Sequence, residues 1–189
     1  MPSDRETAFA VWLTGLPASG KSTVARALAA ELAGKGIRAA VLESDAVRRE
    51  ITPNASYGEA ERDAFYATLA YLARMLVLHG VPVIVDATAN RRTYRDRARA
   101  AIPRFLEAHV RCPLAVCQAR DSKGIYRRGA EGTAQNVPGV SAPYEPPLMP
   151  EVVVDGERDD PAVAARNIVS ALEKNGFLPR GSGDATETG

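Results

Sequence analysis

Residues 15–22 have the residue types and the spacing of a phosphate-binding loop. They read Gly-Leu-Pro-Ala-Ser-Gly-Lys-Ser and match the pattern G-x-x-x-x-G-K-[ST] at every defined position. In such a loop, glycines let successive backbone N–H groups point at an anion, and the following helix adds the positive end of its dipole. We expect Lys21 to reach the β- and γ-phosphates of a nucleoside triphosphate and the Ser22 hydroxyl to ligate Mg²⁺. The other residues expected to contact the nucleotide here are Gly15, Ala18, Ser19, Gly20 and Thr23.

Two carboxylates follow short apolar runs and are candidates for the chemistry. Asp45 comes shortly after the run 38–42, and Asp86 directly after the run 81–85. Asp45 could take a proton from a substrate hydroxyl or orient Mg²⁺ through water, and its alternative role is a helix N-cap. Asp86 could hold Mg²⁺-bound water or contact the acceptor, and its alternative role is capping or turn formation.

Several basic residues could bind an anionic substrate. Arg48 and Arg62 could grip an anionic acceptor, although each by itself is also compatible with an exposed surface charge. The region 120–150 carries basic side chains of the kind that neutralise charge on a transferred phosphoryl group, namely Arg120, Lys123, Arg127 and Arg128. A further set lies at helical spacing on one face and is predicted to be solvated, namely Arg91, Arg95 and Arg99.

Short apolar runs alternate with helical patterns along the chain. The predicted strands are 9–14, 38–42, 81–85, 105–111 and 152–154. The predicted helices are 21–34, a short piece through Arg48, 59–79, 91–101 with Asn90 as its cap, one containing Cys117, and 161–174. This alternation predicts an α/β fold, a doubly wound parallel five-stranded sheet with helices on both faces. Ligands of such a sheet bind beyond the carboxyl ends of its strands.

The domain prediction is one kinase-type domain over 1–177 with a tail over 178–189 that lacks order. Residues 120–150 are rich in Gly, Pro and charge and show little apolar periodicity. A loop of this length inside a compact domain indicates a lid, and phosphoryl transfer needs water excluded.

Bulk properties exclude several classes of protein. The chain has 189 residues and a net charge of +1, so no overall field favours nucleic acid or an anionic membrane as a partner. Cys112 and Cys117 have no metal-site spacing and are predicted to be reduced thiols, and His79 and His109 have no metal or triad spacing. With no signal-peptide core and no apolar run of membrane length, the expected location is the cytoplasm.

Residues 9–175 resemble the adenylylsulfate kinase family. Val11–Leu16 followed by Ser19–Thr23 is close to the opening of that family. The most family-specific part is the lid, where Ala119–Arg128 keeps a basic K-G-x-Y block. Asn136, Gly139 and Pro143-Tyr144-Glu145 then follow at the family's spacing.

The resemblance implies a homodimeric, Mg²⁺-dependent kinase that uses ATP to phosphorylate the 3′-hydroxyl of adenylyl sulfate in sulfate assimilation. It implies that Asp45 is the catalytic carboxylate and a metal-site residue beside Lys21 and Ser22. Among the basic residues of the lid, those expected to contact ATP are Arg120, Lys123 and Arg127. The resemblance places Arg48 and Arg62 near the acceptor, and the other residues expected to face it are Tyr57, Asp86, Asn90, Lys123 and Val137.

The sequence departs from the family on the acceptor side. The family's D-G-D-N block reads Glu43–Ala46 here and keeps one aspartate. Two phenylalanines that enclose the acceptor's adenine in the family are replaced by Tyr57 and Val137, and an asparagine is replaced around Phe65. The family's F-I-S-P block reads Asp86–Asn90, a D-A-T-x-N form that resembles other small-molecule kinases of the superfamily.

These departures leave alternative functions open. One alternative is a kinase of the same family retargeted to another hydroxyl, such as that of a cytidine diphosphate derivative like cytidine diphosphoramidate, or of a secondary metabolite. Another is a nucleotide-binding partner protein that has lost catalysis. The retention of Lys21, Ser22 and Asp45 argues against the second alternative, because a protein without catalysis need keep none of them.

Overall fold

The computed structural model describes residues 8–180, and their strands and helices alternate along the chain. The strands are β1 Ala10–Thr14, β2 Ala40–Glu43, β3 Val83–Asp86, β4 Phe105–Arg111 and β5 Val152–Asp155. The helices are α2 Lys21–Gly34, α3 Ser44–Ile51, α4 Glu59–Leu78, α5 Arg92–Ala101, α6 Leu114–Ala119, α7 Ile125–Ala130 and α8 Pro161–Lys174.

The strands form one parallel sheet in the order β2-β3-β1-β4-β5, which confirms the predicted fold class. All five residues of the central strand β1 are buried, because helices cover both faces of the sheet. Strand β3 begins at Val83 rather than at 81, since Pro82 has no N–H to give to the ladder.

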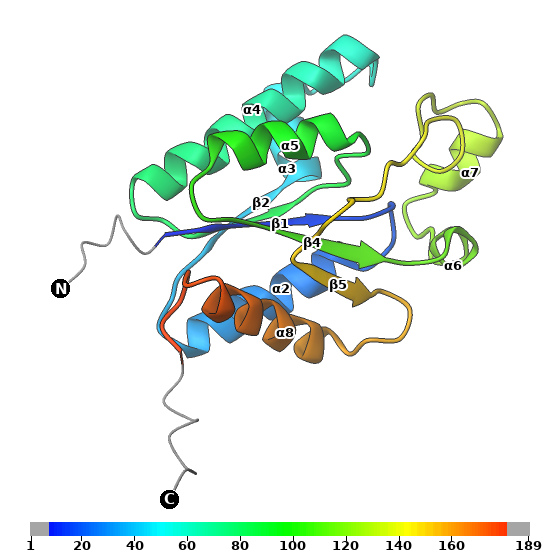
Figure 1. Cartoon of the computed structure of the whole chain (residues 1–189). Coiled ribbons are helices and arrows are strands. Elements are labelled where there is room, and N and C mark those ends of the chain that lie inside the picture. Colours follow the sequence, from blue (N-terminus) through cyan, green and yellow to red (C-terminus); the bar gives the residue numbers. More distant parts are fainter. Residues whose placement is uncertain (1–7, 181–189) are drawn as a thin grey trace, which may run out of the picture.

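Two apolar cores lie on opposite faces of the sheet. Helices α2 and α8 cover one face, and α4 and α5 cover the other (Figure 1). Alternate residues of β1 serve the two cores: Leu13 packs with α2 and α8, whereas Trp12 packs with α4 and α5. The prediction that Trp12 is a core residue is therefore confirmed, with none of its surface exposed.

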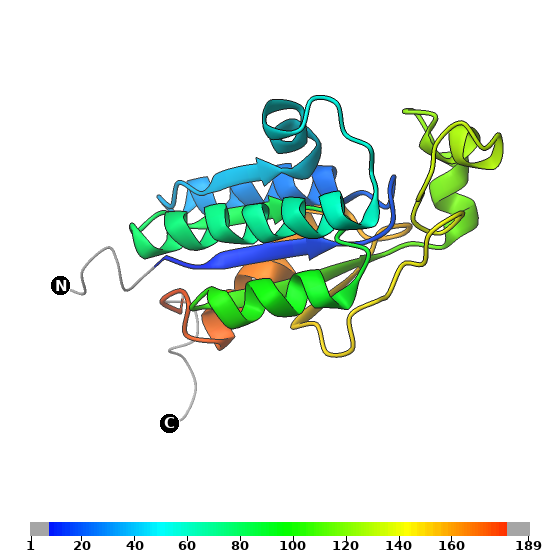
Figure 2. The same cartoon turned by 90° about the horizontal axis from the view of Figure 1, so that it is seen from above.

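The lid, residues 120–150, lies beyond the carboxyl ends of the strands and contains α7, and α6 directly precedes it (Figures 1 and 2). The prediction of an irregular stretch over 120–150 was wrong for α7. That helix begins because the Asp121 carboxylate accepts hydrogen bonds from the N–H groups of Ile125, Tyr126 and Arg127. A small apolar cluster fixes the lid to the domain, formed by Cys112, Cys117, Tyr126 and Val137.

Other expectations need correction. Helix α5 has Arg91 at its N-cap, and the Asn90 side chain donates to the carbonyl of Pro143 instead of capping the helix. Leu178, assigned to the tail, is buried in the α2–α8 core, residues 179 and 180 are exposed, and residues 181–189 lie outside the described range. Within residues 8–180, Cys112 and Cys117 are free of disulfides, and no helix is long and apolar enough to cross a membrane.

Candidate active site

The phosphate-binding loop connects the end of β1 to the first residue of α2. A Cβ on Gly15 would lie 2.4 Å from the carbonyl oxygen of Val110 on β4, so only glycine fits this approach. Gly20 has a φ of 102°, a left-handed conformation at the helix N-cap. The two glycines of the pattern are therefore required by neighbouring backbone and by the turn into α2.

Lys21 lies against this loop with 7% of its surface exposed. Its Nζ donates to the carbonyl oxygens of Gly15 at 3.0 Å and Leu16 at 2.8 Å. Burial lowers the pKa of Lys21, and the carboxylates of Asp86 and Asp45 oppose that shift. The ammonium group is thus held at the loop, near both candidate carboxylates.

A cleft of about 700 Å³ opens at the carboxyl ends of the strands. Most of the predicted site residues line it: Ala18, Gly20, Lys21, Ser22, Thr23, Asp45, Arg48, Tyr57, Arg62, Asp86, Arg120, Lys123 and Val137. Gly15, Ser19, Asn90 and Arg127 are not among the lining residues. The loop and the lid thus enclose one cleft together with the candidate acceptor residues.

Asp45 joins the lid to the sheet side of the cleft. It is the second residue of α3, whose N-cap is Glu43, so its alternative role as a helix N-cap is wrong. Its Oδ2 accepts a hydrogen bond from Lys123 Nζ at 2.7 Å. Both side chains are more than 60% exposed, and the hydrogen bond to Asp45 is the main cause of a raised pKa at Lys123. The carboxylate is accessible to a substrate.

Arg48 lies under the acceptor side of the cleft. It is 8% exposed, and its Nη1 forms an ion pair with Glu61 Oε1 at 2.7 Å. Its guanidinium carbon lies 3.7 Å from the ring centroid of Phe65 and 5.0 Å from that of Tyr57. A paired guanidinium between two rings has a fixed position, so Arg48 is a preorganised cation rather than a mobile surface charge.

Arg62 connects segments that are far apart in the sequence. One amino group donates to Asn90 Oδ1 at 3.4 Å, and the other donates to the carbonyl of Asn136. The Asn136 amide in turn donates to the carbonyl of Tyr57 at 2.9 Å. Burial lowers the pKa of Arg62. Asn90 therefore contributes to the cleft through Arg62.

The two positions expected to enclose a base differ in exposure. Tyr57 is 46% exposed and takes a left-handed φ of 56°. Val137 is 4% exposed and packs into the lid cluster, where a Cβ on Gly129 would lie 2.9 Å from its Cγ2. Tyr57 presents a ring to the cleft, whereas most of Val137 belongs to the interior of the lid.

The basic lid residues occupy different places. Arg120 donates to the carbonyl of Gly156 at 2.6 Å, in the loop between β5 and α8. Arg128 lines the cleft and donates to the carbonyl of Lys123 at 2.9 Å, whereas Arg127 lies outside the lining. The Tyr126 hydroxyl donates to the carbonyl of Pro17 at 2.9 Å, which joins α7 to the phosphate-binding loop.

Sequence reasoning did not assign Glu61 or Asn136 to the site, although the spacing of Asn136 was noted, and it was wrong about Arg95. Arg95 was predicted to be solvated but is 1% exposed, because its Nε pairs with Glu107 Oε1 at 2.7 Å. Glu107 was a usable signal, as the one charged residue within the apolar stretch Phe105–Ala108 of a central strand. An acid at such a position requires a buried cationic partner.

The chain is similar to proteins of known activity. A model of the adenylylsulphate kinase family matches residues 7–155. An adenylyl-sulfate kinase of Microcystis aeruginosa is 38% identical over 174 residues, covering 92% of this chain and 96% of that protein. A probable bifunctional SAT/APS kinase of Sorangium cellulosum is 35% identical over 91% of this chain, which spans 30% of its length. The structure of the Mycobacterium tuberculosis APS kinase in complex with AMPPNP and APS has a TM-score of 0.82 and 31% identity, covering 88% of this chain and 98% of that chain.

Proposed function

The chain belongs to the adenylylsulphate kinase family, and on this basis we propose that it transfers the γ-phosphate of ATP to the 3′-hydroxyl of adenylyl sulfate. The observation that carries the proposal is the single cleft that joins the phosphate-binding loop, Asp45 and the acceptor-side arginines. A kinase needs donor and acceptor to meet in line within one enclosed volume.

Lys21 and Asp45 perform the central steps in this proposal. The backbone N–H groups of the loop hold the triphosphate, and Lys21 exchanges its two carbonyl contacts for the β- and γ-phosphate oxygens. Asp45 aligns the acceptor hydroxyl and accepts its proton as the phosphorus–oxygen bond forms. The γ-phosphate leaves ADP in the same displacement.

The oxygen groups near the loop fit a magnesium ion. The Ser22 hydroxyl is exposed to the cleft, and the carboxylates of Asp45 and Asp86 line the same space. Mg²⁺ prefers hydroxyl, carboxylate and water oxygens and binds together with substrate phosphates. Ser22 would ligate the ion directly and Asp45 through water. The bound ion would neutralise phosphate charge.

Lid residues complete the donor site. Arg120 and Lys123 face the cleft and neutralise charge on the transferred group. Lys123 is held by Asp45 in this structure, and we propose that it moves to the γ-phosphate when ATP enters. Arg127 was expected here as one of the basic lid residues but does not line the cleft, and Arg128 occupies the lining position beside it.

The acceptor lies between the lid and α4 in this proposal. Tyr57 stacks on its base, and Arg48 and Arg62 face its anionic group. Asn90 holds Arg62, and Val137 closes the opposite side with a smaller apolar surface. The family resemblance also supports a homodimer that acts in the cytoplasm in sulfate assimilation, and light scattering tests the dimer.

The deciding experiment is a coupled ADP-release assay with Mg-ATP. Adenylyl sulfate is compared with cytidine diphosphate derivatives and with a blank that lacks acceptor. We expect fast, saturable turnover with adenylyl sulfate. Turnover with a cytidine derivative alone would contradict the proposed acceptor. ATP binding without turnover for any acceptor would contradict the proposed kinase activity.

A further inference from the structure

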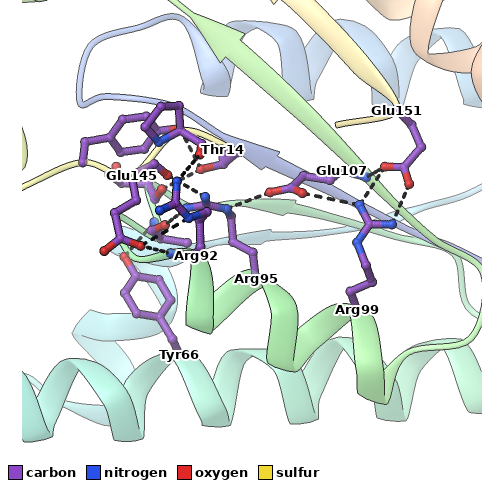
Figure 3. A network of polar contacts seen from close by, with 12 residues as sticks. Thr14, Tyr66, Arg92, Arg95, Arg99, Glu107, Glu145 and Glu151 are labelled. Atoms are coloured by element: carbon purple, nitrogen blue, oxygen red, sulfur yellow. Dashed lines mark hydrogen bonds and ion pairs between the residues drawn. The ribbon is translucent and has the colours of Figure 1, made fainter. Parts of the chain in front are cut away.

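Arg95 contacts three segments that are separate in the sequence, although it lies outside the cleft lining. It projects from α5 with 1% of its surface exposed. Its Nη1 donates to the carbonyl of Ala89, and its Nη2 donates to the carbonyl of Glu145 at 2.6 Å. Its Nε donates to Glu107 Oε1 at 2.7 Å, so the guanidinium plane is fixed by a buried carboxylate (Figure 3). The Arg95 side chain thus connects β4, the loop after β3 and the part of the lid that contains Glu145.

Ala89 is the point at which this side chain affects the site. Its φ is 41°, a left-handed conformation that costs energy in a residue with a Cβ. The N–H of Ala89 donates to the Tyr66 hydroxyl at 3.0 Å, and its carbonyl accepts from Arg95. The peptide groups on both sides of this residue are therefore held by buried side chains, which supports the unfavourable conformation.

Asn90, the residue after Ala89, connects this loop to Arg62 in the cleft. Asn90 donates to the carbonyl of Pro143 at 2.9 Å, and its own carbonyl accepts from the N–H of Glu145 at 2.8 Å. With its backbone so fixed, Asn90 presents Oδ1 to Arg62, which also reaches Asn136. Hence Arg95 is linked to Arg62 through Ala89 and Asn90, two consecutive residues of the loop after β3.

We propose that Arg95 is a positioning residue for the acceptor side: it holds Ala89 and Glu145 so that Asn90 fixes Arg62 in the cleft. This inference rests on the proposed function, because it assigns Arg62 to the acceptor. The inference predicts an effect on binding of the acceptor and not on binding of ATP, since none of the hydrogen bonds of Arg95 reaches the phosphate-binding loop.

Arg99 offers a matched control on the same helix. It also pairs with Glu107, at 3.4 Å, and with Glu151 at 2.5 Å, but it contacts neither Ala89 nor Glu145 (Figure 3). A role limited to ion pairing with Glu107 predicts similar effects from changing either arginine. A positioning role predicts an effect on the acceptor for Arg95 alone.

The test compares Arg95→Lys and Arg99→Lys, which both keep a cation near Glu107. Steady-state ADP release gives the KM of adenylyl sulfate and of ATP. We expect Arg95→Lys to raise the KM of adenylyl sulfate by about 10-fold and to leave the KM of ATP within about two-fold. Arg99→Lys should leave both values within about two-fold of wild type. Equal KM changes for the two substrates, or none in either variant, would overturn the proposal.

Hydrogen exchange tests the same inference without turnover. We expect the backbone N–H groups of 86–91 and 144–145 to exchange faster in Arg95→Lys than in Arg99→Lys, and those of the phosphate-binding loop, 15–22, to be unchanged. If wild type does not turn over adenylyl sulfate, the proposed function fails, and exchange still decides the role of Arg95. Equal protection of these segments in the two variants would contradict that role.

A second variant covers the case in which Arg95→Lys does not fold. Tyr66→Phe removes the hydroxyl that accepts from the Ala89 N–H and leaves the aromatic stacking with Tyr94 in place. It should raise the KM of adenylyl sulfate by about three-fold and expose the same loop to exchange, while the KM of ATP stays constant. An unchanged loop and an unchanged KM in this variant would count against the proposal.

Discussion

The donor and acceptor sides of the cleft are built in different ways. The phosphate-binding part of the donor side is a single segment, 15–23, in which two glycines and the start of α2 present backbone groups. The acceptor side is assembled from α3, α4, the loop after β3 and the lid. Its side chains are held by arginines that bond to carbonyls of distant segments.

This difference explains which side can change its chemistry. Backbone contacts do not depend on the identity of the intervening side chains, so the donor side is preserved as long as the glycines and Lys21 remain. An acceptor side made of side chains changes with each substitution. Under the proposed function, we therefore expect the replacements at Tyr57 and Val137 to alter base recognition and to leave phosphate binding intact.

The largest expected effect tests the donor side. Lys21→Ala should lower kcat by about 100-fold or more, because the ammonium group acts on charge that develops in the transition state. Lys35→Ala is the control, since Lys35 follows the far end of α2 and, among residues 8–180, pairs only with Glu173 at 3.5 Å. Steady-state ADP release measures both. A near-wild-type rate for Lys21→Ala would remove Lys21 from catalysis.

Asp45→Asn tests the group between the two sides. The amide keeps the size of the carboxylate but cannot accept the hydroxyl proton, so kcat should fall by about 100-fold. Lys123→Met breaks the same 2.7 Å contact from the other partner. It should cost about 10-fold in kcat/KM for ATP. If the two variants lose activity equally and in the same kinetic constant, Asp45 acts only by holding the lid.

The fold followed from the sequence to within a few residues, because alternating apolar runs and helical stripes are local signals. Helix α8 was predicted with its observed ends, and β4 likewise. Helix α7 was missed because its start depends on Asp121, whose carboxylate folds back onto three N–H groups. Those hydrogen bonds depend on the turn that the backbone makes after Asp121, which the apolar pattern of the sequence does not indicate.

The parts of the candidate site formed by consecutive residues could be predicted from the sequence, whereas the parts formed by distant residues could not. The phosphate-binding loop could be read from eight consecutive residues. Arg95 was misjudged because a run of arginines at helical spacing is usually solvated, and its partner Glu107 lies on another element. The contact of Arg62 with Asn136 spans 74 positions, and no local pattern encodes it.

Tyr57→Ala sharpens the acceptor half of the comparison. Stacking on a base is worth about 1–3 kcal/mol, so the KM of adenylyl sulfate should rise by about 10-fold while the KM of ATP stays constant. Tyr57→Phe keeps the ring and should retain the wild-type KM. Both values come from the ADP-release assay. An unchanged KM in Tyr57→Ala would place the base elsewhere in the cleft.

The smallest expected effect concerns the sheet beneath the acceptor side. Burial lowers the pKa of His109 to about 4, with Arg95 and Arg111 adding to the shift, and the ring of Tyr144 lies 6.1 Å away between centroids. The unfolded imidazole takes up its proton near pH 6.5, whereas the folded one stays neutral down to about pH 4. The unfolded chain therefore binds more protons between these pH values, and the folded state loses stability as the pH falls through this window.

His109→Gln should consequently reduce the drop in melting temperature between pH 7 and pH 5 by about 3 °C relative to wild type. His79→Gln, at the exposed end of α4, is the matched control and should keep the wild-type drop. Thermal unfolding followed by circular dichroism measures all three proteins, and an identical drop in His109→Gln and wild type would show that this histidine does not couple the fold to pH.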